Sequence, residues 1–268
     1  RKEYASAVRV KAGTVSNAVP GKAEVFVPVS ADEVKAAVAK LNNADFTYNV
    51  SAADNGANVV ITGIAAHAST PEQGKNAFLA AVQLMNELNL PEEDADTVAV
   101  LWDILKFDCH GETLGIDGED ASGRLTLNPG VLDWDETGIH RLTFDVRAPI
   151  SSKAKELEKK ITEGIKETGL VQTDISWSEG YYISPDDELV KKLLDVYAAR
   201  FGQRLEPLAI GGGTYARMLG GNGVAFGPAF KNDDVRMHNA DESMDKENFF
   251  KHAQICLEAM YRMFTDGE

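Results

Sequence analysis

Cysteine and long apolar runs are scarce in this sequence of 268 residues. Its two cysteines, Cys109 and Cys256, form neither a disulfide framework nor a paired metal-binding motif. No run of about 18 apolar residues occurs, and the first residues lack the apolar core of a signal peptide, so we expect no membrane span. A reducing cytoplasm is the simplest compartment to expect for such a chain.

Positively charged residues are also few. Lysine and arginine number 27 against 42 aspartate and glutamate residues, which gives a formal net charge of -15 at pH 7. No basic patch offsets this excess, and a phosphate backbone would be repelled, so we expect no nucleic-acid partner. The hydrophobic content of 44% and the charged content of 26% are ordinary for a globular protein of one large domain or two smaller ones.

Residues 1–95 predict an α+β block of order ββαββα. Ser30 and Glu33 form a capping box, which predicts a helix that begins just after Ser30. Asn55 and Gly56 predict a tight turn between two strands.

Residues 96–183 predict a second block of similar content. We expect strands at 124–127, 139–147 and 171–177, a charged helix over 151–168, and either a helix or a buried strand at 98–105. The two blocks indicate an internal duplication of structure, without a repeat of residues.

Residues 184–268 predict a third section of different character. Ser184 is the expected N-cap of its first helix, a strand is expected at 224–226, and a final helix over 245–264. This section is typical of part of an open α/β sheet domain, and we expect the rest of that domain to precede Arg1.

His67 lies between an expected strand and an expected helix, for which Thr70 suits the N-cap. A histidine in such a loop is most often a surface or packing residue. Its functional alternative is an imidazole that donates a hydrogen bond to a developing oxyanion.

Three further positions allow both a functional and a structural interpretation. His238 lies in an acidic loop, where it is either a solvated residue or a zinc ligand oriented by a carboxylate. Arg147 ends a strand, where it is either an ordinary surface arginine or a bidentate carboxylate ligand. The glycine run at 211–213 is either a plain turn or an anion-binding loop, and it is not a P-loop, because no Gly-Lys-Ser/Thr follows.

Five short motifs, taken in order, resemble one family of enzymes. They are Asn-x-Val-Pro at 17–20, Ala-His-Ala-Ser-Thr-Pro at 66–71, Asp-Val-Arg at 145–147, Gly-Gly-Gly-Thr-Tyr-Ala-Arg at 211–217 and His-x-x-Asp-Glu at 238–242. This set is similar to that of the di-zinc metallopeptidases related to aminoacylase and carnosinase, nearest the bacterial dipeptidase V branch. The resemblance covers nearly the whole chain.

The resemblance implies a fold and a reaction. The implied fold is α+β, with antiparallel sheets and helices on one face, arranged over 1–183 as a doubled ferredoxin-like lid. Residues 184–268 would be the C-terminal part of an α/β zinc-peptidase catalytic domain. The implied reaction is the zinc-dependent hydrolysis of dipeptides, with two zinc ions in the complete enzyme.

The resemblance also assigns roles to residues. His238 matches a zinc ligand, and His67 matches the lid histidine that polarises the scissile carbonyl. Asn17 and Arg147 match lid residues that contact the substrate, Arg147 through the terminal carboxylate. The loop that also holds that end of the peptide matches Gly212, Gly213 and Thr214.

The family's other zinc ligands have no counterpart before Asn17. We therefore expect that an N-terminal metal-binding segment is missing, that this chain alone hydrolyses nothing, and that it can self-associate. Two alternatives stay open: an N-acyl amino acid deacylase of the same superfamily, and a non-catalytic ferredoxin-like module for oligomerisation or binding.

Overall fold

The computed structural model describes residues 5–166, 169–227 and 241–265. The chain divides into two compact units, Arg1–Glu179 and Gly180–Glu268. Each unit is described below by itself.

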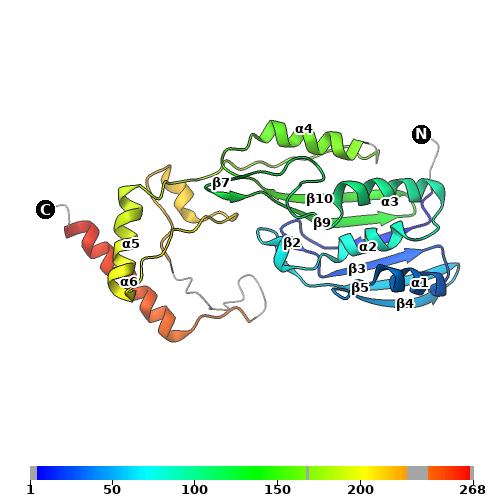
Figure 1. Cartoon of the computed structure of the whole chain (residues 1–268), viewed down its shortest axis with the longest axis horizontal. Coiled ribbons are helices and arrows are strands. Elements are labelled where there is room, and N and C mark those ends of the chain that lie inside the picture. Colours follow the sequence, from blue (N-terminus) through cyan, green and yellow to red (C-terminus); the bar gives the residue numbers. More distant parts are fainter. Residues whose placement is uncertain (1–4, 167–168, 228–240, 266–268) are drawn as a thin grey trace. The chain divides into compact units, whose positions relative to one another are not determined.

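Unit 1 is built on one antiparallel sheet of six strands in the order β10-β9-β1-β3-β5-β4 (Figure 1). Its strands are β1 (Arg9–Ala12), β3 (Lys22–Val27), β4 (Thr47–Ala53), β5 (Gly56–Thr62), β9 (Thr126–Asp135) and β10 (Gly138–Arg147). Two short pairs accompany it: β2 (Ala18–Val19) with β6 (Ala66–His67), and β7 (Glu119–Asp120) with β8 (Gly123–Arg124). Strands from both expected blocks therefore share one sheet, joined where β1 pairs with β9.

Helices cover one face of this sheet. They are α1 (Ala31–Leu41), η1 (Pro71–Gln73), α2 (Ala77–Asn86), α3 (Glu92–Leu105) and α4 (Ala154–Ile165). Helices α1 and α2 pack on β3, β4 and β5, and α3 packs on α2 and α4. The unit has the ferredoxin-like α+β fold that the resemblance implies, with antiparallel strands backed by helices.

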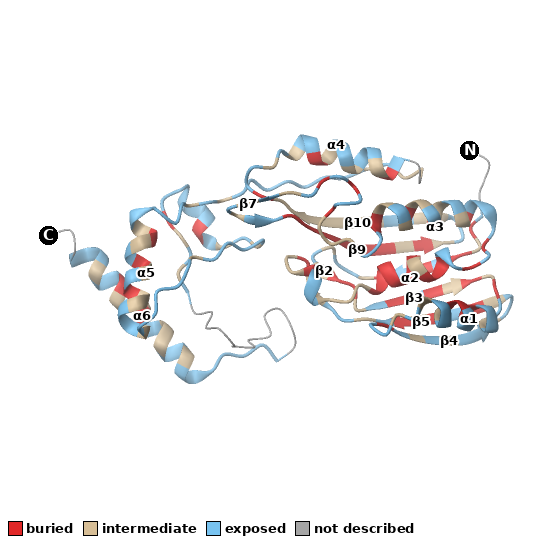
Figure 2. Ribbon diagram, viewed as in Figure 1, coloured by how far each residue is buried: buried red, intermediate tan, exposed pale blue. Residues whose placement is uncertain are grey.

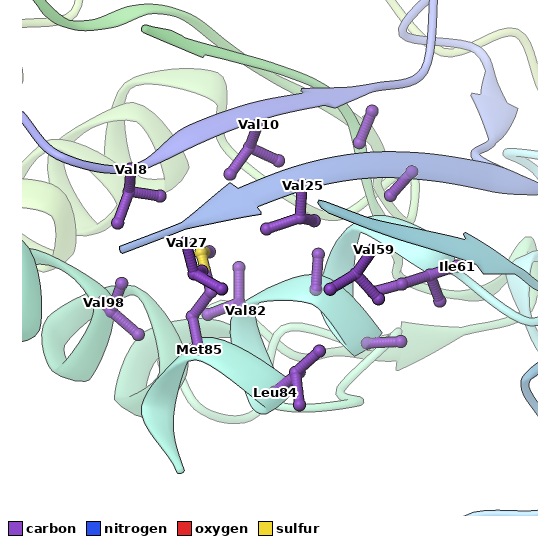
Figure 3. Close-up of a cluster of buried hydrophobic side chains, with 14 of the residues drawn as sticks. Val8, Val10, Val25, Val27, Val59, Ile61, Val82, Leu84, Met85 and Val98 are labelled. Carbon is purple, nitrogen blue, oxygen red and sulfur yellow. The ribbon is translucent and has the colours of Figure 1, made fainter. Parts of the chain in front are cut away.

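The alternation of apolar residues along the strands builds the core. Three valines on neighbouring strands, Val10, Val25 and Val59, are at most 3% exposed. The residues directly before and after each valine along its own strand are more exposed. Figure 3 shows these side chains pointing toward Val82 and Met85 of α2. The period of two residues decides which face of a strand is buried.

Local signals in the sequence account for several element boundaries. The Ser30 side chain accepts a hydrogen bond of 3.2 Å from the backbone N–H of Glu33, as the capping box predicts. Asn55 adopts φ 60° in the turn between β4 and β5. The ambiguous segment 98–105 lies in α3, which settles it as a helix.

Two expectations for unit 1 are wrong. Thr70 does not cap the helix with its side chain; η1 follows it instead, and α2 begins later, where Asn76 accepts hydrogen bonds from Phe78 and Leu79. Residues 171–177 form no strand. A strand needs a neighbour to satisfy its backbone groups, and the described part of the chain offers this segment none.

Unit 2 is helical in its described part. It contains α5 (Glu188–Phe201), η3 (Tyr215–Leu219) and α6 (Lys246–Thr265). Helices α5 and α6 pack through four buried residues, Leu193, Val196, Ile255 and Ala259. Buried positions are red in Figure 2, and much of the unit is exposed.

Two expectations for unit 2 are also wrong. Asp187, not Ser184, caps α5, because its side chain accepts from the backbone N–H of Leu189. The strand expected at 224–226 is absent from the structure, since no other segment in the described part of this unit pairs with it. The expected final helix is confirmed as α6. Across both units, no described helix is both long and apolar enough to cross a membrane.

Candidate functional site

Two of the predicted site residues lie side by side in unit 1. Strand β2 pairs with β6 so that Ala18 is opposite His67. The carbonyl oxygen of Asn17 accepts a hydrogen bond of 3.0 Å from the backbone N–H of Ala68. Asn17 is exposed and His67 is half-buried, so both side chains lie at the surface of this two-stranded element.

Hydrogen bonds to Nδ1 set the state of the His67 ring. The backbone N–H of Ser69 donates to Nδ1 at 3.1 Å, and the Ser69 hydroxyl lies 2.7 Å from the same nitrogen. A nitrogen that accepts a backbone N–H carries no proton, so the neutral ring holds its proton on Nε2. The loop thereby makes Nε2 the donor of the imidazole.

Arg147 ends strand β10, opposite Thr126 of β9. Its guanidinium is held by Asp145, through a bond of 2.9 Å from Nη2 to Oδ2 and a second from Nε to Oδ1. The two side chains are 25% and 14% exposed, so this bidentate pair is largely shielded from water. The carboxylate fixes the Nε edge of the guanidinium and therefore its orientation.

Thr126 connects Arg147 to the histidine loop. Its Oγ1 donates a long hydrogen bond of 3.4 Å to the carbonyl oxygen of Ala68, the residue after His67. Thr126 is at the same time the register partner of Arg147. The structure thus brings Asn17, His67 and Arg147 to one end of unit 1.

Two asparagines, the buried Asn128 and the half-buried Asn76, hold this end of the unit together. Asn128 is 1% exposed and donates from Nδ2 to the carbonyl oxygens of Ser16 and Ala18, both at 2.9 Å. Its Oδ1 accepts from Nδ2 of Asn76 at 3.3 Å. Asn76 also donates to the carbonyl of Pro129 and caps α2. One network of amides therefore joins the Asn17 turn, strand β9 and helix α2.

The sequence interpretation assigned a role to neither asparagine. Asn76 carried a usable signal, since asparagine is a favoured N-cap and an apolar helix follows it directly. Asn128 carried none, because Asn128-Pro129-Gly130 is typical of a turn. The structure instead has a bulge inside β9, where the register against β10 shifts beside Pro129. Proline is tolerated at a bulge because its missing N–H leaves no ladder bond unmade.

A cavity of about 330 Å³ lies beside the amide network, lined in part by Asn76, Asn128, Phe46 and Phe107. Cys109 also lines it. Burial, and then the nearby negative charges, raise the pKa of the Cys109 thiol. The thiol therefore stays protonated near neutral pH and is a poor nucleophile.

The remaining predicted residues belong to unit 2. Gly212, Gly213 and Thr214 precede η3, and Thr214 makes no side-chain cap there. A Cβ added at Gly213 would lie 2.9 Å from Nη1 of Arg217. His238, the predicted zinc ligand, lies outside the described residues.

The described residues do not form a zinc site. No group of three or more histidine, cysteine, aspartate or glutamate side chains able to hold a metal ion occurs among residues 5–166, 169–227 and 241–265. A catalytic zinc needs about three protein ligands. A zinc site that uses this chain therefore includes at least one ligand from outside the described residues.

Residues 55–172 match the peptidase dimerisation domain of the M20 family. The chain is 29% identical over 259 residues to "Putative dipeptidase YtjP" of Bacillus subtilis, which covers 96% of this chain and 55% of that protein. It is 30% identical over 217 residues to Beta-Ala-Xaa dipeptidase of Lactobacillus delbrueckii subsp. lactis, which covers 80% of this chain and 46% of that protein.

These matches support the M20 peptidase family that the resemblance predicts. It spans about half the length of the relatives it matches. A Staphylococcus epidermidis relative named "Putative dipeptidase" follows the same pattern, with 31% identity over 264 residues, 97% of this chain and 56% of that protein.

Proposed function

We propose that this chain is part of an enzyme that hydrolyses dipeptides. The dipeptidase names of its relatives support this reaction. The observation that carries the proposal is the grouping of Asn17, His67 and Arg147 at one end of unit 1. Hydrogen bonds hold each of them: Ala68 binds the Asn17 backbone, Ser69 binds the His67 ring, and Asp145 binds the Arg147 guanidinium.

His67 is proposed as the catalytic residue. Its Nε2–H donates to the oxygen of the scissile carbonyl as negative charge develops there during attack by water. Such a donor is effective when it is fixed beforehand, since no reorganisation is then needed in the transition state. The hydrogen bonds from Ser69 to Nδ1 supply that preorganisation.

Arg147 and Asn17 are proposed to hold the substrate. Asp145 orients the Arg147 guanidinium, and this cation is proposed to bind the terminal carboxylate of a dipeptide. In unit 2, the backbone N–H groups of Gly212, Gly213 and Thr214 are proposed as further substrate-binding groups.

A requirement for two zinc ions is part of this proposal. His238 is the one ligand predicted within the 268 residues. The other ligands are proposed to come from a segment outside these residues, so that this chain alone is inactive. The match to a dimerisation domain supports self-association of the chain as a further expectation.

The test compares the chain alone with the chain joined to the part of the Lactobacillus relative that the match does not cover. Both proteins are assayed with β-alanyl dipeptides, α-dipeptides and N-acyl amino acids, and their zinc content is measured. The proposal expects about two zinc ions and dipeptide hydrolysis only in the joined protein. Preferred cleavage of N-acyl amino acids would favour the deacylase alternative, and no turnover of any substrate would favour the non-catalytic module.

A further inference from the structure

We propose that Asn128 is a positioning residue of the dipeptidase site, which sets the Asn17 turn against the strands that carry Arg147. This inference rests on the proposed function of that site. Asn128 touches no substrate in this account. It acts through the backbone on either side of Asn17.

The two hydrogens of the Asn128 amide are fully used. Both are donated over 2.9 Å to carbonyl oxygens, one from Ser16 and one from Ala18, which flank Asn17 in the sequence. A side chain that binds both neighbours of a residue fixes the backbone direction at that residue. Asn128 therefore decides where the Asn17 side chain points.

The acceptor of the same amide is anchored from the opposite side. Nδ2 of Asn76 donates to Oδ1 of Asn128, and the Asn76 side-chain oxygen is itself held by the first turn of α2. This anchor fixes the amide orientation, so that Nδ2 and not Oδ1 faces the carbonyls. Because Asn128 is 1% exposed, water has little access to replace a lost bond.

Asn128 also occupies a defined place relative to Arg147. Its register partner on β10 is Asp145, which binds the Arg147 guanidinium. Strand β9 thus contacts the Asn17 turn through the Asn128 side chain. It contacts the Asp145–Arg147 ion pair through the backbone pairing of β9 with β10. A change at Asn128 alters the spacing between two substrate contacts that come from residues 130 positions apart in the sequence.

Backbone packing at the bulge reinforces this arrangement. A Cβ added at Gly130 would lie 2.5 Å from the carbonyl oxygen of Ser16. Only glycine lets the turn approach β9 this closely, and this approach brings the Ser16 carbonyl within reach of Asn128.

The first test measures amide hydrogen exchange in the 268-residue chain. Asn128→Ala is expected to speed exchange at Ala68, whose N–H donates to Asn17, by about tenfold or more relative to the core amide of Val59. Ser6→Ala is the matched control, because it also removes a buried hydrogen bond, the one from Ser6 to Asp94. This bond lies next to Trp134, whose Nε1–H donates to Ser6, and not next to the Asn17 turn. Trp134 lies six residues from Asn128 along β9, about 20 Å away.

The second test uses the joined protein under conditions where every variant is folded. A misplacement of about 1 Å can lower the rate of a reaction by about 100-fold, so Asn128→Ala is expected to lower kcat/KM by that order. Asn17→Ala and Asn128→Ala act on one contact, so the double variant is expected to be no slower than the slower single variant. Ser6→Ala should leave kcat/KM unchanged.

The outcomes separate the two levels of the account. An active joined protein in which Asn128→Ala behaves like Ser6→Ala, or in which the two asparagine effects multiply, overturns the positioning role and leaves the proposed function intact. A joined protein that holds zinc but hydrolyses no dipeptide overturns both. Faster exchange at Ala68 together with a non-additive loss of kcat/KM supports both.

Discussion

The backbone N–H of Ser69 points at Nδ1 of His67 over a distance of 3.1 Å. This bond comes from the backbone, so it persists whatever side chain occupies position 69. It predicts that the neutral His67 ring carries its proton on Nε2, in the wild type and in Ser69→Ala alike. Two-bond 1H–15N correlation spectra of the neutral ring distinguish the two tautomers. A proton on Nδ1 in the folded protein would contradict the proposed donor.

Buried Asp94 joins the start of unit 1 to helix α3. It is 0% exposed and accepts hydrogen bonds from Ser6 Oγ at 2.7 Å and from the backbone N–H of Ala7 at 2.9 Å. Asp94→Ala leaves both donors without this acceptor, so we expect the free energy of unfolding to fall by about 3 kcal/mol. Urea denaturation measures the change.

The control for this substitution is Asp96→Ala in the same helix. Asp96 is exposed, and its removal should change the free energy of unfolding by less than about 0.5 kcal/mol. Equal effects at the two positions would mean that helix charge, and not the buried hydrogen bonds, determines the stability at Asp94.

The hydroxyl of Tyr48 is buried without a hydrogen-bond partner among the described residues. Tyr48→Phe removes this unsatisfied group, so we expect the free energy of unfolding to rise by about 1 kcal/mol at neutral pH. Thermal or urea unfolding checks this. A clear loss of stability would show that the hydroxyl has a partner in solution.

The same tyrosine predicts a dependence on alkaline pH. Burial raises the pKa of Tyr48 from 10.0 to about 12, so the folded protein keeps its proton after the unfolded chain has lost it. The unfolded state then binds fewer protons, and the free energy of unfolding falls as the pH rises from 10 toward 12. Tyr48→Phe should flatten this fall; an unchanged slope would assign it to other groups.

The carboxylate of Asp135, the last residue of β9, resists protonation. The Thr137 hydroxyl and N–H, followed by His140, hold the pKa of Asp135 at about 2, below the ordinary 3.8. Because the folded pKa is depressed, the stabilisation is present above pH 3.8 and is lost as the pH falls toward 2. Thr137→Val should raise the pKa of Asp135 in a 13C carboxyl titration. The control Thr47→Val, at an exposed position of β4, should leave it unchanged.

Much of the fold follows from signals that lie close together in the sequence. Ser30 and Glu33 are three residues apart, and the cap they predict is present. The apolar alternation around Val10, Val25 and Val59 predicts both the strands and their buried face. Such features depend on the residue itself and on its immediate neighbours.

The errors fall where a distant partner decides the outcome. Residues 171–177 have the composition of a strand, yet strand formation requires a neighbouring strand that composition does not reveal. At the start of α2, Thr70 and Asn76 are both good N-caps, and the turn at Pro71 leaves the helix to begin at the second.

For the candidate site, the motifs named residues but not their supports. The resemblance indicated Asn17, His67 and Arg147, and the structure brings these three together. The role of Asn128 could not be predicted from the sequence, because its side chain binds carbonyl oxygens 110 and 112 residues earlier in the chain. The zinc ligation predicted for His238 stays a prediction, since that residue is outside the described part of the chain.

The central claim is that His67 stabilises the transition state of dipeptide hydrolysis, and the kinetics of His67→Ala in the joined protein test it most directly. Removal of one oxyanion donor typically costs about 100- to 1,000-fold in kcat. The account predicts a loss of that size in kcat, with KM for a β-alanyl dipeptide changed by less than about threefold and zinc content unchanged. A kcat equal to that of the wild type, at full zinc content, would contradict the account.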